Sequence, residues 1–181
     1  MADPANLYAP PTAELTEPAA SRSAFFAVSP LKLVVMSTAT FGIYEMWWSY
    51  QNWRSFKLRG EKLNPPLRGL FAGFTNFSLF HRLRDDAARA GLVVSFAPTA
   101  WALAYLLLLS AWRLPDPTGT LLSVLTVVPL LAANSLALRL NDRLTPELRI
   151  SAPWTALNVV GSLLGLVIWG VAAWASFQPQ E

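Results

Sequence analysis

The feature that most constrains the fold is a long apolar stretch, residues 31–53, which ends in a group of aromatic side chains. A helix of about 20 apolar residues crosses a hydrocarbon core roughly 30 Å thick. Trp and Tyr favour the boundary between lipid and water. The end of the stretch carries five of them: Tyr44, Trp47, Trp48, Tyr50 and Trp53. We therefore predict a first membrane span over residues 31–50, ending in an interfacial aromatic belt.

The composition favours a membrane protein over a soluble domain. Hydrophobic residues make up 54% of the 181 positions, charged residues make up only 14%, and the mean hydropathy is +0.37. The basic residues lie between apolar segments and form no continuous patch, so we expect no nucleic-acid partner. The sequence has no cysteine, and its single histidine, His81, cannot build a metal site alone. We therefore expect no metal ion and no other cofactor.

The rest of the chain divides into a tail and one membrane domain. Residues 1–24 are predicted to be a flexible tail, because a segment rich in proline and alanine buries too little apolar surface to offset its ordering entropy. It also lacks the basic start and apolar core of a signal peptide. Residues 25–177 form the predicted membrane domain, and residues 178–181 form a short C-terminal end. The further predicted spans are residues 93–112, 120–138 and 155–177.

Residues 66–90 are predicted to form an amphipathic helix that is interfacial or re-entrant. Their apolar run of about 12 residues covers roughly 18 Å, which is too short for a crossing. Within this helix, Asp85 and Arg89 have the i, i+4 spacing of an ion pair. The basic end is expected to contact anionic headgroups through His81, Arg82, Arg84 and Arg89. The predicted fold class is therefore an all-α integral membrane protein with four transmembrane helices and one interfacial or re-entrant helix.

A full crossing by residues 66–80 remains an alternative. The pattern S-L-x-x-R-L-x-D occurs at residues 78–85 and again at 135–142, where it begins on a predicted span. A crossing would move the amino terminus to the cytoplasmic side. Without it, the segments 51–92 and 139–154 hold eleven of the fourteen Lys and Arg residues and are expected to be cytoplasmic, with both termini outside.

Glu45 is the most notable side chain, because an acidic group inside a span is costly and often functional. At helical spacing Thr38 shares its face, and the later spans carry the polar residues Asn134 and Asn158, which we expect to hydrogen-bond to each other. These four residues form a candidate intramembrane polar site. Two roles for Glu45 remain open: a structural partner of a cytoplasmic Arg or Lys, or a binding group for a proton, an ion or a headgroup.

The last predicted span contains Gly161 and Gly165 in a GxxxG pattern, which lets another backbone approach closely. This helix is expected to pack either against the other spans or against a second copy of the chain. The preceding span contains Pro129, where we expect a kink in the helix.

No nucleophile elbow, phosphate-binding glycine loop or zinc spacing occurs in the sequence, so we expect no enzyme activity. We predict an accessory or scaffold subunit of a membrane complex, with the bilayer and either a protein partner or a second copy as its contacts. The alternative is a small transporter or lipid-handling protein that uses Glu45.

The segment Thr40-Phe41-Gly42-Ile43-Tyr44, followed by Trp47 and Trp48, resembles a signature of small bacterial membrane proteins, T-[FL]-G-[IL]-Y-x-x-[YW]-W. That group is described only as a domain of unknown function. The similarity in order extends from Phe25 to about Asn141 and includes the P-D-P turn at residues 115–117. The resemblance implies a multi-pass protein of the bacterial cytoplasmic membrane, and no particular activity.

Overall fold

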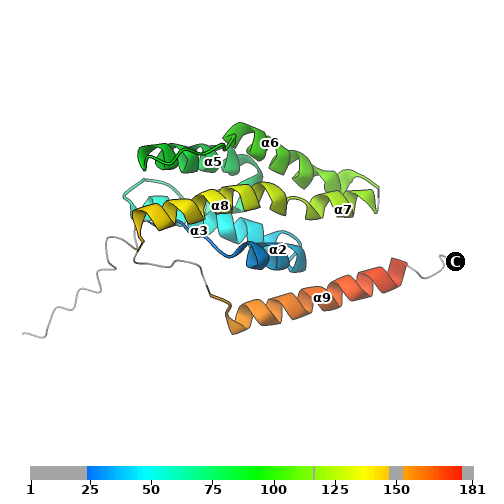
Figure 1. Ribbon diagram of the computed structural model, residues 1–181. Helices are drawn as coiled ribbons and strands as arrows, with labels where there is room; N and C mark the ends of the chain where they lie inside the picture. Colours follow the sequence, from blue (N-terminus) through cyan, green and yellow to red (C-terminus); the bar gives the residue numbers. More distant parts are fainter. Residues whose placement is uncertain (1–23, 116, 147–152, 177–181) are drawn as a thin grey trace, which may run out of the picture.

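The computed structural model describes residues 24–115, 117–146 and 153–176 of the chain (Figure 1). Every element in this part is a helix, which confirms the all-α prediction. The helices are α2 (Pro30–Ala39), α3 (Ile43–Leu58), α4 (Pro65–Leu70), α5 (Ala72–Arg89), α6 (Pro98–Leu109), the 3₁₀ helix η1 (Ser110–Arg113), α7 (Thr118–Val124), α8 (Val127–Leu144) and α9 (Ala156–Ser176). The predicted tail before Ala24 and the C-terminal end 178–181 lie outside the described residues.

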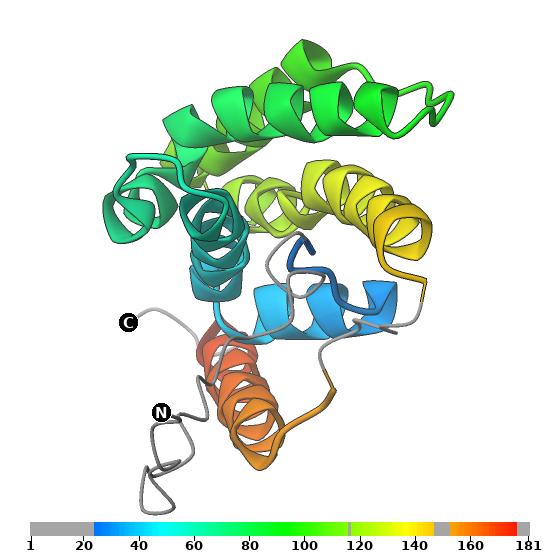
Figure 2. The ribbon, with the colours of Figure 1, turned by 90° about the vertical axis from the view of Figure 1, so that its left-hand side faces the viewer.

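Helix α5 packs against α3, α6 and α8 to form a bundle. Helix α2 lies beside α8, and α9 packs on α2, away from α5 and α6 (Figure 2). The core side of α8 carries Leu130, Ala133, Ala137 and Leu140, all fully buried. Their spacing of three and four residues places them on one face of the helix, and the two alanines allow close packing. The bundle is thus organised around α8.

The predicted first span is broken into two helices. Helix α2 ends at Ala39, and α3 starts at Ile43 after Phe41 and Gly42, whose φ angles are 51° and 84°. The Gly42 N–H donates to the Ser37 carbonyl at 2.9 Å, which closes the end of α2. Glycine takes a positive φ at little cost, so Gly42 allows the chain to turn here. The prediction of one continuous helix over residues 31–50 is therefore wrong.

Four continuous transmembrane helices are not supported. Among the described residues, only the 27-residue stretch Thr118–Leu144 is long and apolar enough to cross a bilayer, with a mean hydropathy of 2.1 in its most apolar part. The predicted second span begins at Pro98 instead of Val93, and its α-helix of 12 residues is too short. The apolar helix Pro30–Ala39 is also shorter than a span, as is Ala156–Val171, the part of α9 over which every side chain is described. The coarser conclusion is a helical protein with one candidate membrane-spanning stretch.

The α-helical hydrogen bonding of the Thr118–Leu144 stretch is interrupted near the position where a kink was predicted. Helix α7 ends at Val124 and α8 starts at Val127. Pro129 has no N–H to offer the carbonyl of Leu125, and its ring would clash with that carbonyl in a regular helix. The interruption at residues 125–126 follows from this, whereas a change of direction stays a prediction.

Helices α4 and α5 form a hairpin that begins and finishes at the same end of the bundle. Arg59, before the hairpin, pairs with Asp86 near its end at 2.5 Å, and Glu61 pairs with Arg82. At its inner turn the hairpin reaches α3, where a Cβ on Gly69 would lie 2.6 Å from the Tyr50 Cβ. The chain thus turns back within the bundle, and a re-entrant or interfacial position of residues 66–90 stays a prediction.

The predicted ion pair between Asp85 and Arg89 is not the one that the structure contains. Arg89 pairs with Asp86 instead, at i, i+3 spacing. Asp86 thereby receives two guanidinium groups, since Arg59 also binds it. Asp86 faces the hairpin loop, whereas Asp85 is exposed.

An extended segment, residues 24–29, lies in the core next to α8. Asn141 donates to the Phe25 carbonyl and accepts from the Phe25 N–H, both at 2.8 Å. Seven residues earlier, Asn134 does the same with Val28, at 2.7 and 3.0 Å. An extended backbone buried in a core needs such partners, because its polar groups form no helix or sheet bonds.

Candidate functional site

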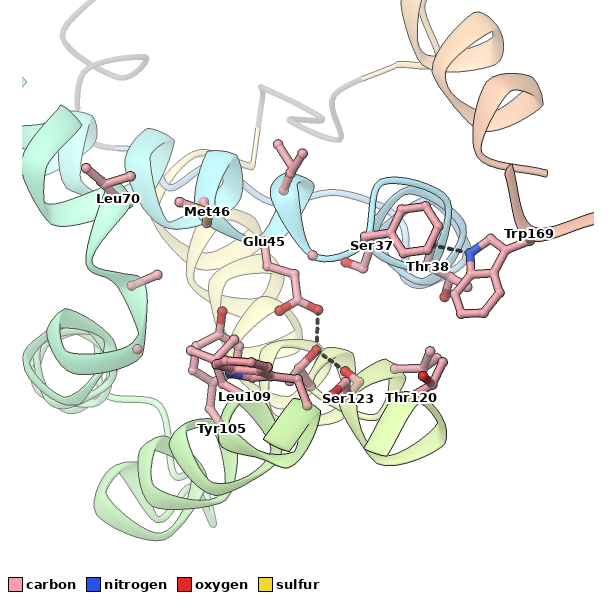
Figure 3. A pocket seen from close by; sticks show the side chains of 18 residues that line it. Ser37, Thr38, Glu45, Met46, Leu70, Tyr105, Leu109, Thr120, Ser123 and Trp169 are labelled. Carbon is pink, nitrogen blue, oxygen red and sulfur yellow. Dashed lines mark hydrogen bonds between the residues drawn. The ribbon is translucent and has the colours of Figure 1, made fainter. Parts of the chain in front are cut away.

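The candidate site is a cavity where two helix breaks meet. Glu45 lies in the first turn of α3, just after the α2–α3 break, and only 2% of its surface is exposed. Thr126 lies in the α7–α8 break, and its Oγ1 is 2.9 Å from Glu45 Oε1. Figure 3 shows the Tyr105 hydroxyl directed toward the Glu45 carboxylate, and a dashed line marks the hydrogen bond that this carboxylate accepts from Thr126. The two breaks thus place polar groups face to face inside the bundle.

Thr126 is positioned by the break itself. Its hydroxyl oxygen is 2.8 Å from the Ser123 carbonyl as well as 2.9 Å from Glu45. A hydroxyl has one proton, so it donates to one of these acceptors at a time. Thr126 therefore links the carboxylate to the end of α7.

A cavity of about 490 Å³ opens beside the carboxylate. Its hydroxyl groups come from Ser37, Thr38, Thr120, Ser123, Thr126 and Tyr105. Its aromatic walls come from Phe41, Tyr105, Trp112 and Trp169. Ligand pockets are typically about 300–1,000 Å³ and mostly apolar with a few polar groups, and this cavity has that size and character.

The cavity carries no basic side chain. None of the described residues that line it is Lys, Arg or His. Glu45 therefore has hydroxyl neighbours instead of the predicted cytoplasmic Arg or Lys. Its position in the first turn of α3 places the carboxylate at the positive end of the helix dipole, which favours negative charge there.

One of the hydroxyl groups beside the cavity has no hydrogen-bond partner within the described part of the chain. It is the Oγ of Ser123, which is shielded from solvent. The Oγ of Ser37 is also shielded, and its neighbour in the cavity lining is the Glu45 carboxylate. Buried polar groups are nearly always hydrogen-bonded, so Ser123 indicates room for a polar ligand atom or a water molecule.

The predicted polar site is only partly brought together. Thr38 lines the cavity with Glu45, and its carbonyl accepts from Trp169 Nε1 at 3.0 Å. Asn134 lies elsewhere, where Val28 and Trp48 Nε1 occupy its side chain. Asn158 caps α9 by a reciprocal pair of bonds with Thr155. The predicted hydrogen bond between Asn134 and Asn158 is therefore wrong.

The two glycines of the GxxxG pattern have different surroundings. A Cβ on Gly165 would lie 2.1 Å from the Ala39 carbonyl oxygen at the end of α2, so the two backbones touch there. A Cβ on Gly161 would have nothing within 4 Å. Trp169, one turn after Gly165, stacks on Phe41 with ring centroids 4.9 Å apart. The contact of α9 thus closes one side of the cavity.

The predicted headgroup contacts lie on one exposed end of α5. His81 is exposed and its Nδ1 is 2.7 Å from the Phe77 carbonyl. Arg84 and Arg89 are also exposed, whereas Arg82 is half-buried, pairs with Glu61 and lies over the Trp53 ring. Contact of these side chains with headgroups stays a prediction.

Sequence reasoning missed Tyr105, Thr126, Ser37 and Ser123. Tyr105 lies within an apolar run and reads as an ordinary core aromatic. Thr126 carries a usable signal, because it precedes Pro129 by three residues, where a helix break exposes side chains and backbone to a neighbour. Within the described ranges, no cluster of three or more His, Cys, Asp or Glu side chains suits a metal ion.

Comparison with known proteins gives no family. No family model, no curated protein and no solved structure matches the chain. The resemblance at residues 40–48 therefore stays a prediction.

Proposed function

We propose that this chain is a multi-pass membrane protein that takes a small ligand into the cavity beside Glu45, as a small transporter or lipid-handling protein does. One observation carries the proposal: a buried carboxylate that faces hydroxyl groups, without a cation, on the wall of a cavity of about 490 Å³. Polar groups within membrane segments are expensive and mark functional sites by default.

The exposed apolar surface of α9 supports membrane insertion. One narrow stripe of this helix, Ser162, Gly165 and Trp169, contacts α2. The rest of its described surface is apolar and exposed, and includes Leu157, Val160, Leu163, Leu164, Val167, Ile168 and Val171. Soluble monomers rarely expose contiguous apolar patches above a few hundred Å². Lipid is the covering that suits a helix of this composition.

Broken helices also suit a membrane protein that binds a ligand. At membrane depth, non-helical backbone is tolerated where it lines a cavity, and discontinuous helices often form binding sites in transporters. Here the α2–α3 break and the α7–α8 break border the same cavity. On this proposal the elements that cross the bilayer are α3, α6 with η1, α7–α8 and α9. Residues 24–39 lead from the Arg59 end of the bundle back to the start of α3, and α4–α5 is the re-entrant segment.

The charge distribution supports one orientation. Helices α3, α5 and α8 end on the same side of the bundle, near Arg59, Arg89 and Arg143, while Arg113 ends η1 on the opposite side (Figure 1). By the positive-inside rule the first of these ends is cytoplasmic. On this proposal the end of α9 lies outside, in a bacterial cytoplasmic membrane, whereas Phe25, whose ring lies 4.3 Å from the Arg59 guanidinium, is at the cytoplasmic end. The proposed orientation therefore departs from the expectation of two outer termini.

The test is uptake or retention of labelled lipids and small molecules by vesicles that contain the purified chain. We expect Glu45→Gln to abolish the activity that the wild-type chain shows over empty vesicles, because it removes the only carboxylate among the described cavity residues. Asp85→Asn, which removes one exposed carboxylate elsewhere, is the matched control and should leave it unchanged. An activity that is equal in wild type and Glu45→Gln would refute the proposal.

A second candidate is an accessory or scaffold subunit of a membrane complex. The observation that favours it is the same exposed face of α9, which suits a protein helix or a second copy as well as lipid. Native mass spectrometry on the chain extracted gently from its own membrane separates the two. A co-purifying protein supports the subunit, whereas a chain that is repeatedly alone with a bound small molecule supports ligand handling.

A further inference from the structure

We infer that the ligand of the cavity is a small organic cation, a substituted ammonium whose charge lies against Glu45 and whose apolar groups lie on the aromatic walls. The inference rests on the proposed function and adds the chemical class of the ligand.

The charged group of the cavity lining favours a positively charged ligand. Glu45 is the only acidic or basic side chain among the described residues of the cavity lining. Taking an isolated carboxylate out of water is costly, and the cost is offset when a positive charge reaches it. The hydroxyl groups of Ser37, Ser123 and Thr126 also line the cavity, and the partial negative charge of their oxygen atoms attracts a substituted ammonium with or without an N–H. A cation therefore matches the polar part of the cavity, whereas an anion would meet a carboxylate.

The aromatic walls of the cavity also favour a cation. Tyr105 is almost fully buried beside the carboxylate, and Trp112, Trp169 and Phe41 line the same space. Aromatic faces attract cations, and the attraction is strongest for Trp and in sites shielded from water. Substituted ammonium groups are bound in this way in aromatic cages. The rings thus provide both the apolar surface and additional attraction for positive charge.

The size of the cavity and its ligand groups favour an organic cation over a metal ion. A bare metal cation needs several oxygen ligands at about 2.0–2.6 Å, closely converged around it. The described lining holds a single carboxylate, and no cluster of three or more His, Cys, Asp or Glu side chains in the described part of the chain suits a metal ion. An organic ion with alkyl or aryl substituents fills a volume of about 490 Å³.

Exposed apolar side chains of the lining border the entrance of the cavity. Ile43 and Trp112 belong to the lining, yet 68% and 67% of their respective surfaces are exposed. Phe41, also in the lining, is 54% exposed. The mouth of the cavity is thus rimmed by apolar and aromatic groups, which suit an amphipathic cation arriving along the membrane.

The experiment measures the melting temperature of the full chain in lipid nanodiscs with increasing benzyltrimethylammonium. A ligand that binds the folded state raises this temperature by mass action. The neutral probe neopentylbenzene has the same shape without the charge. We expect a saturable rise with the cation and none with the neutral probe at equal concentration.

The variants identify the site. Glu45→Gln should raise the half-saturating concentration of the cation by about 30-fold or more, the factor that corresponds to losing one partner of a buried charge pair. Asp85→Asn should leave it unchanged. Glu45→Gln removes a charge from the interior, so it is expected to fold, and its own melting curve without ligand verifies this.

Two outcomes would overturn the inference: an equal rise with neopentylbenzene, or an unchanged half-saturating concentration in Glu45→Gln. Leu109→Trp, at an exposed position that lines the cavity, then separates the causes. If this variant abolishes the rise, the cavity binds a ligand without regard to charge, so the proposed function stands and the cationic class is wrong. If the rise persists, the probe binds elsewhere, and both proposals fail.

Discussion

At the scale of single residues, Asn134 shows how a polar side chain stabilises this fold from within. It is fully buried, donates to the Val28 carbonyl, and accepts from both the Val28 N–H and Trp48 Nε1. It therefore joins three parts of the chain: the extended segment 24–29, α3 and α8. A buried polar group that loses its partner costs about 1–3 kcal/mol, so the hydrogen bonds of Asn134 contribute substantially to the free energy of unfolding.

We predict that Asn134→Leu lowers the free energy of unfolding by about 3 kcal/mol or more, because it leaves the polar groups of Val28 and Trp48 without partners. Unfolding by denaturing detergent in mixed micelles measures the change. Asn158→Leu is the matched control: it removes an asparagine from a helix cap at the exposed start of α9, and about 1 kcal/mol is expected. Equal effects of the two variants would show that the buried network is not what holds residues 24–29.

The residues of the site were predictable only in part. Glu45 was identified because a carboxylate in an apolar run is conspicuous, and Thr38 because helical spacing places it on the same face. Their actual meeting depends on the break between them, which brings Thr38 to the cavity by a turn and not by helical periodicity. Thr126 and Tyr105 come from distant segments, and no local pattern specifies which of several apolar helices lies opposite Glu45.

At the scale of helices, the α2–α9 contact depends on a glycine. The backbone of α9 touches the end of α2 at Gly165, and Ser162 and Trp169 bind Met36 and the Thr38 carbonyl on either side. The GxxxG pattern predicted a close approach without telling which glycine makes it. Which of the two glycines touches α2 depends on the side of α9 that faces α2, and tertiary packing sets that side.

We predict that Gly165→Leu separates α9 from α2, because even a Cβ would overlap the Ala39 carbonyl. The chain has no native cysteine, so a pair introduced by Met36→Cys and Ser162→Cys reports the contact by oxidative cross-linking in membranes. The cross-linked fraction should fall strongly with Gly165→Leu and stay unchanged with Gly161→Leu, whose added side chain meets open space. Loss of the cross-link with both substitutions would point to a second copy packed at Gly161.

The helix breaks show what the sequence conceals at this scale. Pro129 predicted the α7–α8 break, because proline removes a specific hydrogen bond. Gly42 did not predict the α2–α3 break, since the apolar composition continues through it and glycine is common inside membrane helices. The length of the apolar run in residues 66–80, about 12 residues, predicted an interfacial or re-entrant helix because it falls short of a crossing, and this stays a prediction.

At the scale of the whole molecule, the ion pairs and the membrane orientation constrain each other. Arg59 pairs with Asp86 and Glu61 pairs with Arg82, so the start and the finish of the α4–α5 hairpin lie together. A bilayer cannot pass between groups that touch. If the chain is inserted in a membrane, residues 59–62 and 82–89 therefore lie on one side of it, and the alternative in which residues 66–80 cross would require both ion pairs to break.

We predict that single cysteines introduced by Lys62→Cys and Asp85→Cys react with a membrane-impermeant maleimide from the same side, the cytoplasmic one, while Thr118→Cys reacts from the other. All three positions are exposed. Intact spheroplasts and inverted vesicles present the two sides separately. Labelling of Lys62→Cys and Asp85→Cys from opposite sides would mean that residues 66–80 cross the bilayer. Labelling of Thr118→Cys from the cytoplasmic side would mean that the positive-inside orientation is reversed. A reporter fused after Glu181 is an independent measure, because the C-terminus should lie outside when the basic end is cytoplasmic.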